Sequence, residues 1–150
     1  MAKKVIDLAI VIPTLNEEKY IGSLLDSILS QSVQPAEIAV IDEYSKDKTE
    51  GEVKKRKQQL PQLKFYRIAQ YSISRQRNFG AKKTISPHIL FLDADTVLVD
   101  EDTLEKYFEE VTEKKPGLAL AQNYPLSKNW KDIVLFQAAN LGTKIGRAHV

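Results

Sequence analysis

Several features that define whole classes of protein are missing from this chain. Its 150 residues include no cysteine, which excludes disulfide scaffolds, thiolate metal sites and cysteine nucleophiles. The 22 basic and 20 acidic residues give a formal net charge of only +2, too small to indicate binding of nucleic acid. The apolar run at residues 5–12 contains Asp7, is too short to span a membrane and lacks a signal-peptide cleavage pattern. These absences are compatible with a cytoplasmic protein.

Common cofactor and nucleophile motifs are also missing. No Gly-x-Gly-x-x-Gly follows the first predicted strand and the chain has no Gly-Lys-Ser, which argues against dinucleotide and P-loop nucleotide binding. The nucleophile motif Gly-x-Ser-x-Gly is absent as well. The two histidines, His88 and His149, lie at a strand start and next to the last residue, so we expect both to be structural or incidental.

The chain does contain an alternation of apolar strands and amphipathic helices. Strands are predicted at residues 8–12, 38–41, 63–68, 89–92 and 118–121, and helices over 17–29, 47–59, 75–84, 104–116 and 132–141. The expected N-caps of the first three helices are Asn16, Asp47 and Ser74. This alternation predicts an α/β fold, a mainly parallel sheet with helices on both faces, in one domain over residues 1–150.

Polar side chains follow each of the first four predicted strands. These clusters lie at residues 13–17, 42–45, 70–77 and 93–95. The carboxyl ends of parallel strands meet at one edge of a sheet, and open α/β sheets bind their ligands there. We therefore expect the four clusters to form one site.

The pair Asp93 and Asp95 carries the most specific chemistry among these clusters. Neighbouring carboxylates repel each other unless a cation, a proton or a hydrogen-bonding ligand compensates them. Carboxylate and phosphate oxygens are the ligands that Mg²⁺ and Mn²⁺ prefer. We therefore favour a metal or phosphate site here over the alternative that both residues only form a turn or a helix cap.

The other polar residues have structural alternatives that the sequence leaves open. Asp42 belongs either to the site or to a turn after its strand, while Asn16 and Glu17 are individually typical of a helix start. Arg75 and Arg77 either pair with surface acids or reach a diphosphate.

Two further patterns favour structural roles. The basic run at residues 54–57 predicts a solvated helix face, because only Val53 and Leu60 of the second helix are expected to face inward. Gly80 predicts close packing of a helix on the sheet.

Four motifs in a fixed order resemble the signature of family 2 glycosyltransferases with the GT-A fold, a Rossmann-like α/β fold. They are Val-Ile-Pro-Thr-Leu-Asn-Glu-Glu at residues 11–18, Ile-Ala-Val-Ile-Asp-Glu-Tyr-Ser at 38–45, Arg-Gln-Arg-Asn-Phe-Gly at 75–80 and Ile-Leu-Phe-Leu-Asp-Ala-Asp at 89–95. The resemblance implies metal-dependent transfer of a sugar, with inversion, from a nucleotide-diphosphosugar to an unknown acceptor that is lipid-linked or a glycan. Among donors it favours UDP-sugars, and the implied cofactor is Mn²⁺ or Mg²⁺.

The resemblance also assigns roles to individual residues. The nucleotide pocket would be lined by Pro13, Thr14, Asn16 and Glu17. Asp42 would contact the base, and Arg75 or Arg77 would lie near the donor. Asp93 would lie near the ribose or sugar, and Asp95 would bind the divalent ion next to it. At Asp42 the match is imperfect, because Glu43 and Tyr44 stand where many relatives have Asp-Gly or Asp-Ser.

The general base that the family uses is not found in this chain. Family members supply it from an acidic residue well downstream of the Asp-x-Asp, yet no Asp or Glu follows Asp132. Residues 140–146 resemble the approach to that region. We therefore expect the 150 residues to be a donor-binding portion, truncated on the C-terminal side, or the acceptor half to lie elsewhere.

Alternatives to this function remain open at this point. The apolar helix predicted at 132–141 belongs to the core, or else forms a patch for homo-oligomers or for contact with the cytoplasmic face of a membrane. The domain either transfers sugar or only binds nucleotide sugars. Asp93-Ala-Asp95-Thr-Val also fits the nucleophile motif of a haloacid-dehalogenase-type phosphatase, although the later acidic pair of such enzymes has no candidate here.

Overall fold

The computed structural model describes residues 3–69 and 72–115, which belong to one compact unit, Met1–Lys115. Its elements are β1 (Lys4–Thr14), α1 (Ile21–Ser30), β2 (Val33–Asp42), α2 (Thr49–Arg56), β3 (Leu63–Arg67), α3 (Ile73–Lys83), β4 (His88–Phe91) and α4 (Thr103–Lys114). The strand predicted at 118–121, the helix predicted at 132–141 and the segment 140–146 lie outside the described residues. No helix in the described ranges is long and apolar enough to cross a membrane.

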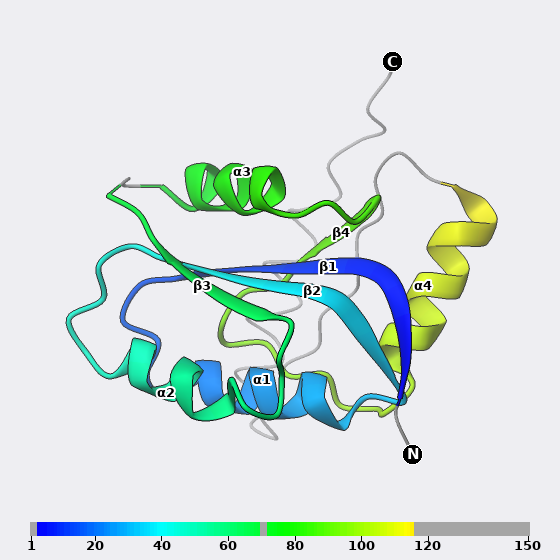
Figure 1. Ribbon diagram of the computed structural model, residues 1–150, viewed down its shortest axis with the longest axis horizontal. Coiled ribbons are helices and arrows are strands. Elements are labelled where there is room, and N and C mark those ends of the chain that lie inside the picture. Colours follow the sequence, from blue (N-terminus) through cyan, green and yellow to red (C-terminus); the bar gives the residue numbers. More distant parts are fainter. Residues whose placement is uncertain (1–2, 70–71, 116–150) are drawn as a thin grey trace, which may run out of the picture. The chain divides into compact units, whose positions relative to one another are not determined.

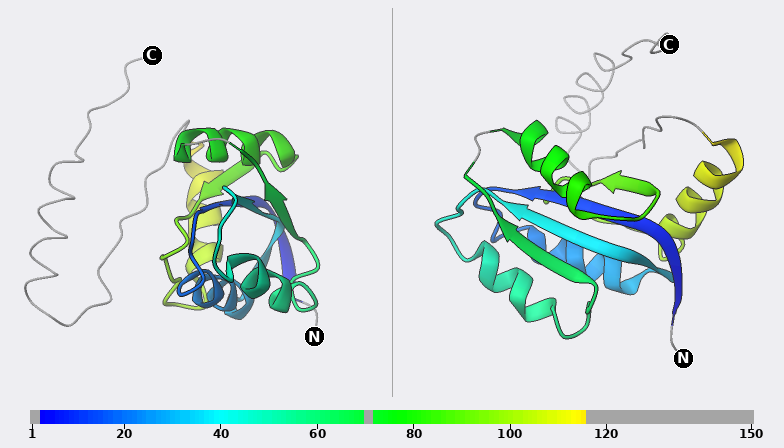
Figure 2. Two further views of the ribbon diagram at one scale, coloured as in Figure 1. Left: turned by 90° about the vertical axis from the view of Figure 1, so that its left-hand side faces the viewer. Right: turned by 45° about the horizontal axis from the view of Figure 1, so that its top comes forward.

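The four strands form one parallel sheet in the order β3-β2-β1-β4. Each parallel pair needs a crossover, and α1, α2 and α3 provide the three that connect successive strands. Figure 1 shows α3 on one face of the sheet and α1 and α2 on the other, and Figure 2 shows the same arrangement from two further directions. The predicted α/β fold with helices on both faces is confirmed.

Alternating residues of β1 divide the core between the two faces. Ile10 and Ile12 pack with the apolar stripe of α1, whereas Val11 packs with Phe79 of α3. All three β1 residues are fully buried, as expected for a central strand covered on both sides. The second helix contributes only Val53 to this core, which agrees with its thin predicted stripe.

The first helix begins later than predicted, and Asn16 is not its cap. Helix α1 starts at Ile21 with Tyr20 at the N-cap, so Glu17 and Glu18 precede the helix instead of forming its first turn. Asn16 adopts a left-handed φ of 56°, which asparagine tolerates better than most residues. Its side-chain oxygen accepts from the backbone N–H of Lys46 (2.9 Å), a distant partner that the local pattern did not reveal.

The caps of the next two helices also differ from the prediction. Ser72, not Ser74, caps α3 and accepts from the backbone N–H of Arg75 at 3.2 Å. Helix α2 starts at Thr49, and Asp47 accepts from the N–H of Thr49 at 3.0 Å without forming the predicted capping box.

Strand β2 begins at Val33, before the predicted start at residue 38, and therefore includes Pro35. Pro35 lies opposite Ile6, next to a register shift in the ladder between β1 and β2. A proline is tolerated beside such an irregularity because its missing N–H removes no regular ladder bond.

Gly80 permits the close approach of α3 to the sheet, as predicted. A Cβ atom at this position would lie 2.3 Å from Cγ1 of Val11 and 3.2 Å from Cγ1 of Ile41. Both neighbours belong to the buried face that α3 covers, so this position has no room for a larger side chain.

Candidate functional site

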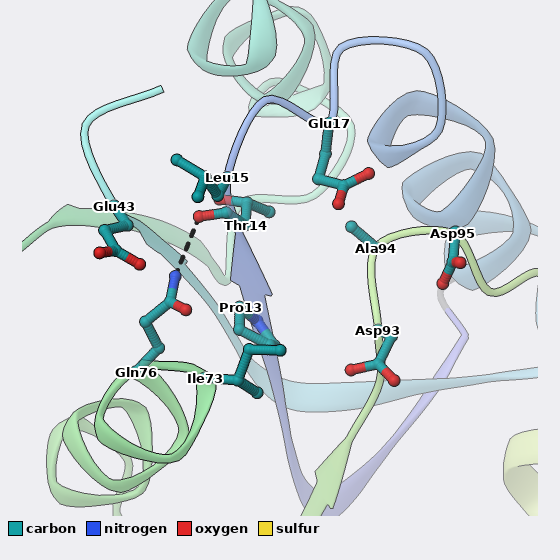
Figure 3. A pocket seen from close by; sticks show the side chains of 10 residues that line it. All are labelled: Pro13, Thr14, Leu15, Glu17, Glu43, Ile73, Gln76, Asp93, Ala94 and Asp95. Carbon is teal, nitrogen blue, oxygen red and sulfur yellow. Dashed lines mark hydrogen bonds between the residues drawn. The ribbon is translucent and has the colours of Figure 1, made fainter. Parts of the chain in front are cut away.

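A cavity of about 390 Å³ lies at the carboxyl edge of the sheet. The loops after β1, β2 and β4 surround it, together with the first turn of α3 (Figure 3). The lining residues are Pro13, Thr14, Leu15, Glu17, Glu43, Ile73, Gln76, Asp93, Ala94 and Asp95. The parallel strands thus bring together polar clusters that are distant in sequence, as we expected.

Asp42 is fully buried directly behind this cavity wall and is not among the lining residues. Its carboxylate accepts from the hydroxyl of Thr14 (3.1 Å), the backbone N–H of Ser45 (3.0 Å) and the hydroxyl of Ser45. The Nε of Arg67 lies 3.4 Å from its second oxygen. These donors compensate the burial of a charged group, which would otherwise be strongly unfavourable.

Tyr44 occupies a backbone conformation that favours glycine. Its φ is 49°, in the left-handed region that glycine adopts without steric cost and other residues rarely adopt. Tyr44 is 56% exposed, and Cζ of Arg67 lies over its ring, 5.6 Å from the ring centroid.

The loops at residues 14–18 and 42–49, here called the paired loops, are joined by hydrogen bonds between the backbone of one and the side chains of the other. The backbone N–H groups of Asn16, Glu17 and Glu18 donate to Ser45 Oγ (2.8 Å), Thr49 Oγ1 (2.8 Å) and Asp47 Oδ2 (3.0 Å). In return, Asn16 Oδ1 and Glu18 Oε2 accept from the N–H groups of Lys46 and Lys48, each at 2.9 Å. The network holds the backbone of Glu17, whose side chain lines the cavity.

Three of the four carboxylates that line the cavity, those of Glu17, Asp93 and Asp95, lie at one end, and Glu43 lies at the other end near Gln76. Burial, followed by the charges of Asp95, Asp47 and Asp93, raises the pKa of Glu17 above its ordinary value. The carboxylate of Asp93 is 57% exposed and accepts from Nη2 of Arg77 at 2.7 Å. The acidic end is therefore only partly neutralised by the protein itself.

The two arginines of α3 have different surroundings. Arg77 pairs with Asp93, which itself lines the cavity. Arg75 is exposed, and its side chain does not line the cavity.

The donor groups at the acidic end fit a divalent cation that is shared with a ligand. Within residues 3–69 and 72–115, no cluster of three or more His, Cys, Asp or Glu side chains forms a ready-made metal cage. Asp93 and Asp95 nevertheless offer carboxylate oxygens to one cavity. Two carboxylates completed by phosphate oxygens of a ligand are a common arrangement for Mg²⁺.

Three residues that line the cavity lie within the predicted clusters, but the sequence assigned them no individual role. Leu15 and Ile73 are 50% and 57% exposed and add apolar surface at its wall, which is typical of ligand pockets. Gln76 is only 2% exposed and donates from Nε2 to the carbonyl oxygens of Thr14 (2.9 Å) and Ile41 (2.8 Å). These partners are 62 and 35 residues away, so the motif at residues 75–80, which contains Gln76, did not reveal its bonds.

The fold and the cavity together define an open-sheet α/β protein with an acidic cavity at the carboxyl edge of its sheet. The sequence profile described as "Glycosyl transferase family 2" matches residues 9–148. The chain therefore belongs to glycosyl transferase family 2, and this membership rules out the phosphatase alternative.

Two bacterial glycosyltransferases are similar to this chain over most of its length. The poly(ribitol-phosphate) beta-N-acetylglucosaminyltransferase TarS of Staphylococcus aureus is 32% identical over 101 residues, 65% of this chain and 17% of TarS. Glycosyltransferase GlyA of Streptococcus pneumoniae is 26% identical over 124 residues, 81% of this chain and 17% of GlyA. This chain thus spans less than a fifth of the length of either relative.

Solved structures share the fold. A crystal structure of S. aureus TarS in complex with UDP-GlcNAc has a TM-score of 0.67 at 25% identity, over 81% of this chain and 39% of that chain. The mannosyltransferase PcManGT of Pyrobaculum calidifontis, solved with GDP-Man and Mn²⁺, has a TM-score of 0.63 at 20% identity, over 87% of this chain and 38% of that chain. The predicted GT-A fold is confirmed, and the chain corresponds to a part of these structures.

Proposed function

We propose that this chain binds a nucleotide-diphosphosugar at the carboxyl edge of its sheet and forms the donor site of a glycosyltransferase. The observation that carries the proposal is the cavity, in which an acidic end meets polar and apolar walls in a chain of this family. The similarity to TarS, whose structure contains UDP-GlcNAc, supports a UDP-sugar as the donor.

The proposal divides the cavity by chemistry. Pro13, Thr14 and Glu17 line it where the nucleotide is expected. Asn16 supports this wall through the paired loops. The predicted contact of Asp42 with the base requires one of its present hydrogen-bond partners to give way, because no part of Asp42 is exposed.

Asp95 and Asp93 would hold the Mn²⁺ or Mg²⁺ ion. When bound there, the ion would stabilise the negative charge that develops on the leaving nucleoside diphosphate. Arg77 fixes the orientation of the Asp93 carboxylate and brings one positive charge close to the same end. Transfer from this site is expected to invert the anomeric centre.

The proposal assigns the donor half of the reaction to residues 1–150 as one domain. It leaves deprotonation of a lipid-linked or glycan acceptor to a residue outside the cavity described here. A cytoplasmic location, contact with a membrane and homo-oligomer formation stay predictions. A domain that only binds nucleotide sugars is the alternative, and measurable release of UDP from UDP-GlcNAc by this chain would contradict it.

Calorimetric titration with UDP, GDP and dTDP, each with and without Mn²⁺, tests the donor site. We expect binding that depends on Mn²⁺ for at least one of the three, with UDP favoured. Absence of such binding to every nucleotide in a folded sample would refute the proposal.

Asp95→Asn tests the position of the ion. The substitution keeps the size of the side chain but removes its charge, so we expect the Mn²⁺ dependence of nucleotide binding to disappear while the fold persists. Asp100→Asn is the matched control, because Asp100 follows on the same loop, is exposed and does not line the cavity. An unchanged Mn²⁺ dependence in Asp95→Asn would place the ion elsewhere.

A further inference from the structure

Two glutamines are almost completely buried in the described part of the chain, and they differ in one respect. Gln31 is 1% exposed and donates from Nε2 to the carbonyl oxygens of Ser27 (3.3 Å) and Asp100 (2.9 Å). Its Oε1 accepts from the backbone N–H of Leu104 at 2.9 Å. Every polar atom of this amide therefore has a protein partner, which is typical of a structural glutamine.

Gln76 has partners for its nitrogen only. Nε2 donates to the carbonyl oxygens of Thr14 and Ile41, and both of these can only accept. The amide cannot be rotated by 180° because its oxygen would then face two other oxygens. The oxygen is thus held on the opposite side, and Figure 3 shows it turned away from Thr14.

The amide oxygen of Gln76 is a hydrogen-bond acceptor on a residue that lines the cavity wall. No donor within residues 3–69 and 72–115 bonds to it, yet it is not among the fully enclosed side-chain atoms that lack a partner. Gln76 lines the cavity, and Figure 3 shows its amide oxygen on the side of the amide that points away from Thr14. A polar atom in such a buried position is favourable only when a ligand or water completes its hydrogen bond.

The sheet order places this oxygen at the end of the cavity opposite the acidic pair. Gln76 bridges β1 and β2, whereas Asp93 and Asp95 follow β4 on the other side of β1. Figure 3 shows the same separation. Under the proposed function the diphosphate lies at the acidic end, so the nucleoside extends toward Gln76.

Resting on that proposed function, we infer that Oε1 of Gln76 accepts a hydrogen bond from the ring N–H of the nucleobase and so helps to determine which base is bound. Uracil, thymine and guanine carry a ring N–H on their pairing edge, whereas cytosine and adenine present an unprotonated ring nitrogen there. The geometry thus selects against CDP and ADP, since an acceptor facing another acceptor leaves both without a partner.

Titrations with Mn²⁺ present test this inference on the unaltered chain and on three variants. Gln76→Met keeps the length of the side chain but removes the amide, both its acceptor and its donor. The lost donor affects UDP and CDP alike, so loss of the acceptor should appear as a roughly tenfold fall in UDP affinity while the weak binding of CDP stays unchanged. Gln76→Glu would turn a carboxylate oxygen toward the carbonyl oxygens of Thr14 and Ile41, so it should bind UDP no better than Gln76→Met. Gln31→Met is the control, because it removes an equally buried amide away from the cavity and should leave UDP affinity unchanged.

The possible outcomes separate this inference from the proposed function. Failure of the unaltered chain to bind any nucleoside diphosphate refutes the proposed function. Binding of UDP that Gln76→Met does not weaken, or an equal loss for UDP and CDP, overturns only the role of Gln76. A tenfold loss in Gln31→Met would indicate general loosening and would also overturn it. If Gln76→Met does not fold, the UDP and CDP affinities of the unaltered chain decide, and equal affinity for both nucleotides contradicts the inference.

Discussion

At the scale of single residues, two helical glycines differ in the room they leave for an added Cβ atom. At Gly80 an added Cβ would lie 2.3 Å from a fully buried side chain, Val11. At Gly51, in α2, no atom lies within 4 Å of the same added Cβ. Glycine is therefore required by packing at one position and only weakens the helix at the other.

Gly80→Ala and Gly51→Ala should change stability in opposite directions. We expect Gly80→Ala to lower the free energy of unfolding by about 1–3 kcal/mol, because Val11 and the helix must move apart. Gly51→Ala should raise it by about 0.5–1 kcal/mol through the better helix propensity of alanine. Urea denaturation measures both, and equal effects of the two substitutions would contradict the close approach of α3 to the sheet.

Residue roles were predictable from the sequence where they depend on local pattern, and not where they depend on distant backbone. The packing role of Gly80 followed from its place in an amphipathic helix. Asn16 and Gln76 bond to backbone atoms 30 and 62 residues away, and those partners appear only when the strands are assembled. The acidic pair stands out in the sequence because it directly follows an apolar strand.

At the scale of elements, the joint between α1 and α2 depends on one arginine. Arg56 donates to Asp26 of α1 through Nε and Nη2, each at 2.7 Å, and to Glu52 through Nη1 at 3.0 Å. Gly22 leaves room for it, since a Cβ there would lie 2.7 Å from Nη2 of Arg56. The prediction of a solvated basic face is right for Lys54, 71% exposed, and wrong for Arg56, 17% exposed.

This joint should make stability depend on acid pH. The hydrogen bond from Arg56 holds the pKa of Asp26 below its ordinary value of 3.8. A carboxyl group with a lowered pKa stabilises the fold above its unfolded pKa, and this contribution is lost as pH falls through the folded pKa. Asp26→Asn should therefore reduce stability at neutral pH by less than about 1 kcal/mol, since the pair is partly exposed.

Denaturation of Asp26→Asn and of the unaltered chain between about pH 7 and pH 3 measures this effect. The difference between them should shrink toward the acid end. When the chain also carries Arg56→Met, Asp26→Asn should cause no difference in stability at any pH, because Asp26 has already lost its partner. A difference that persists in the presence of Arg56→Met would assign the effect to something other than the ion pair.

The elements themselves were predictable in type and order, while their bounds were not. Strands β1 and β2 extend to Lys4 and Val33 because these residues pair with each other in the parallel ladder. Lys4 and Val5 are exposed, so the ladder and not an apolar pattern determines this end of the strand.

At the scale of the whole molecule, the carboxyl ends of the four parallel strands lie at one edge of the sheet. A ligand bound at this edge would contact loops from several strands, so its binding should stabilise the whole fold. A ligand at about one hundred times its Kd adds about 2.7 kcal/mol to the stability of the state that binds it. UDP with Mn²⁺ should therefore raise Tm in a thermal melt.

Removal of the cation should reverse most of that increase. A chelator added to the complex should lower Tm toward that of the free chain, because the carboxylates at the acidic end would again face the diphosphate without an ion between them. The chelator alone should leave the free chain unchanged, since the described residues contain no ready-made metal cage. A complex whose Tm does not respond to the chelator would contradict a bridging cation.

The hydrogen bonds of the paired loops have a consequence for evolution and engineering. Each loop provides side-chain acceptors for backbone N–H groups of the other, so neither loop is complete alone. Transplanting one loop from a relative would leave several amides without acceptors, even where the new sequence suits its own ligand. The smallest exchangeable module at this edge is therefore discontinuous in sequence, and donor preference should be inherited through recombination only when both segments come from the same parent.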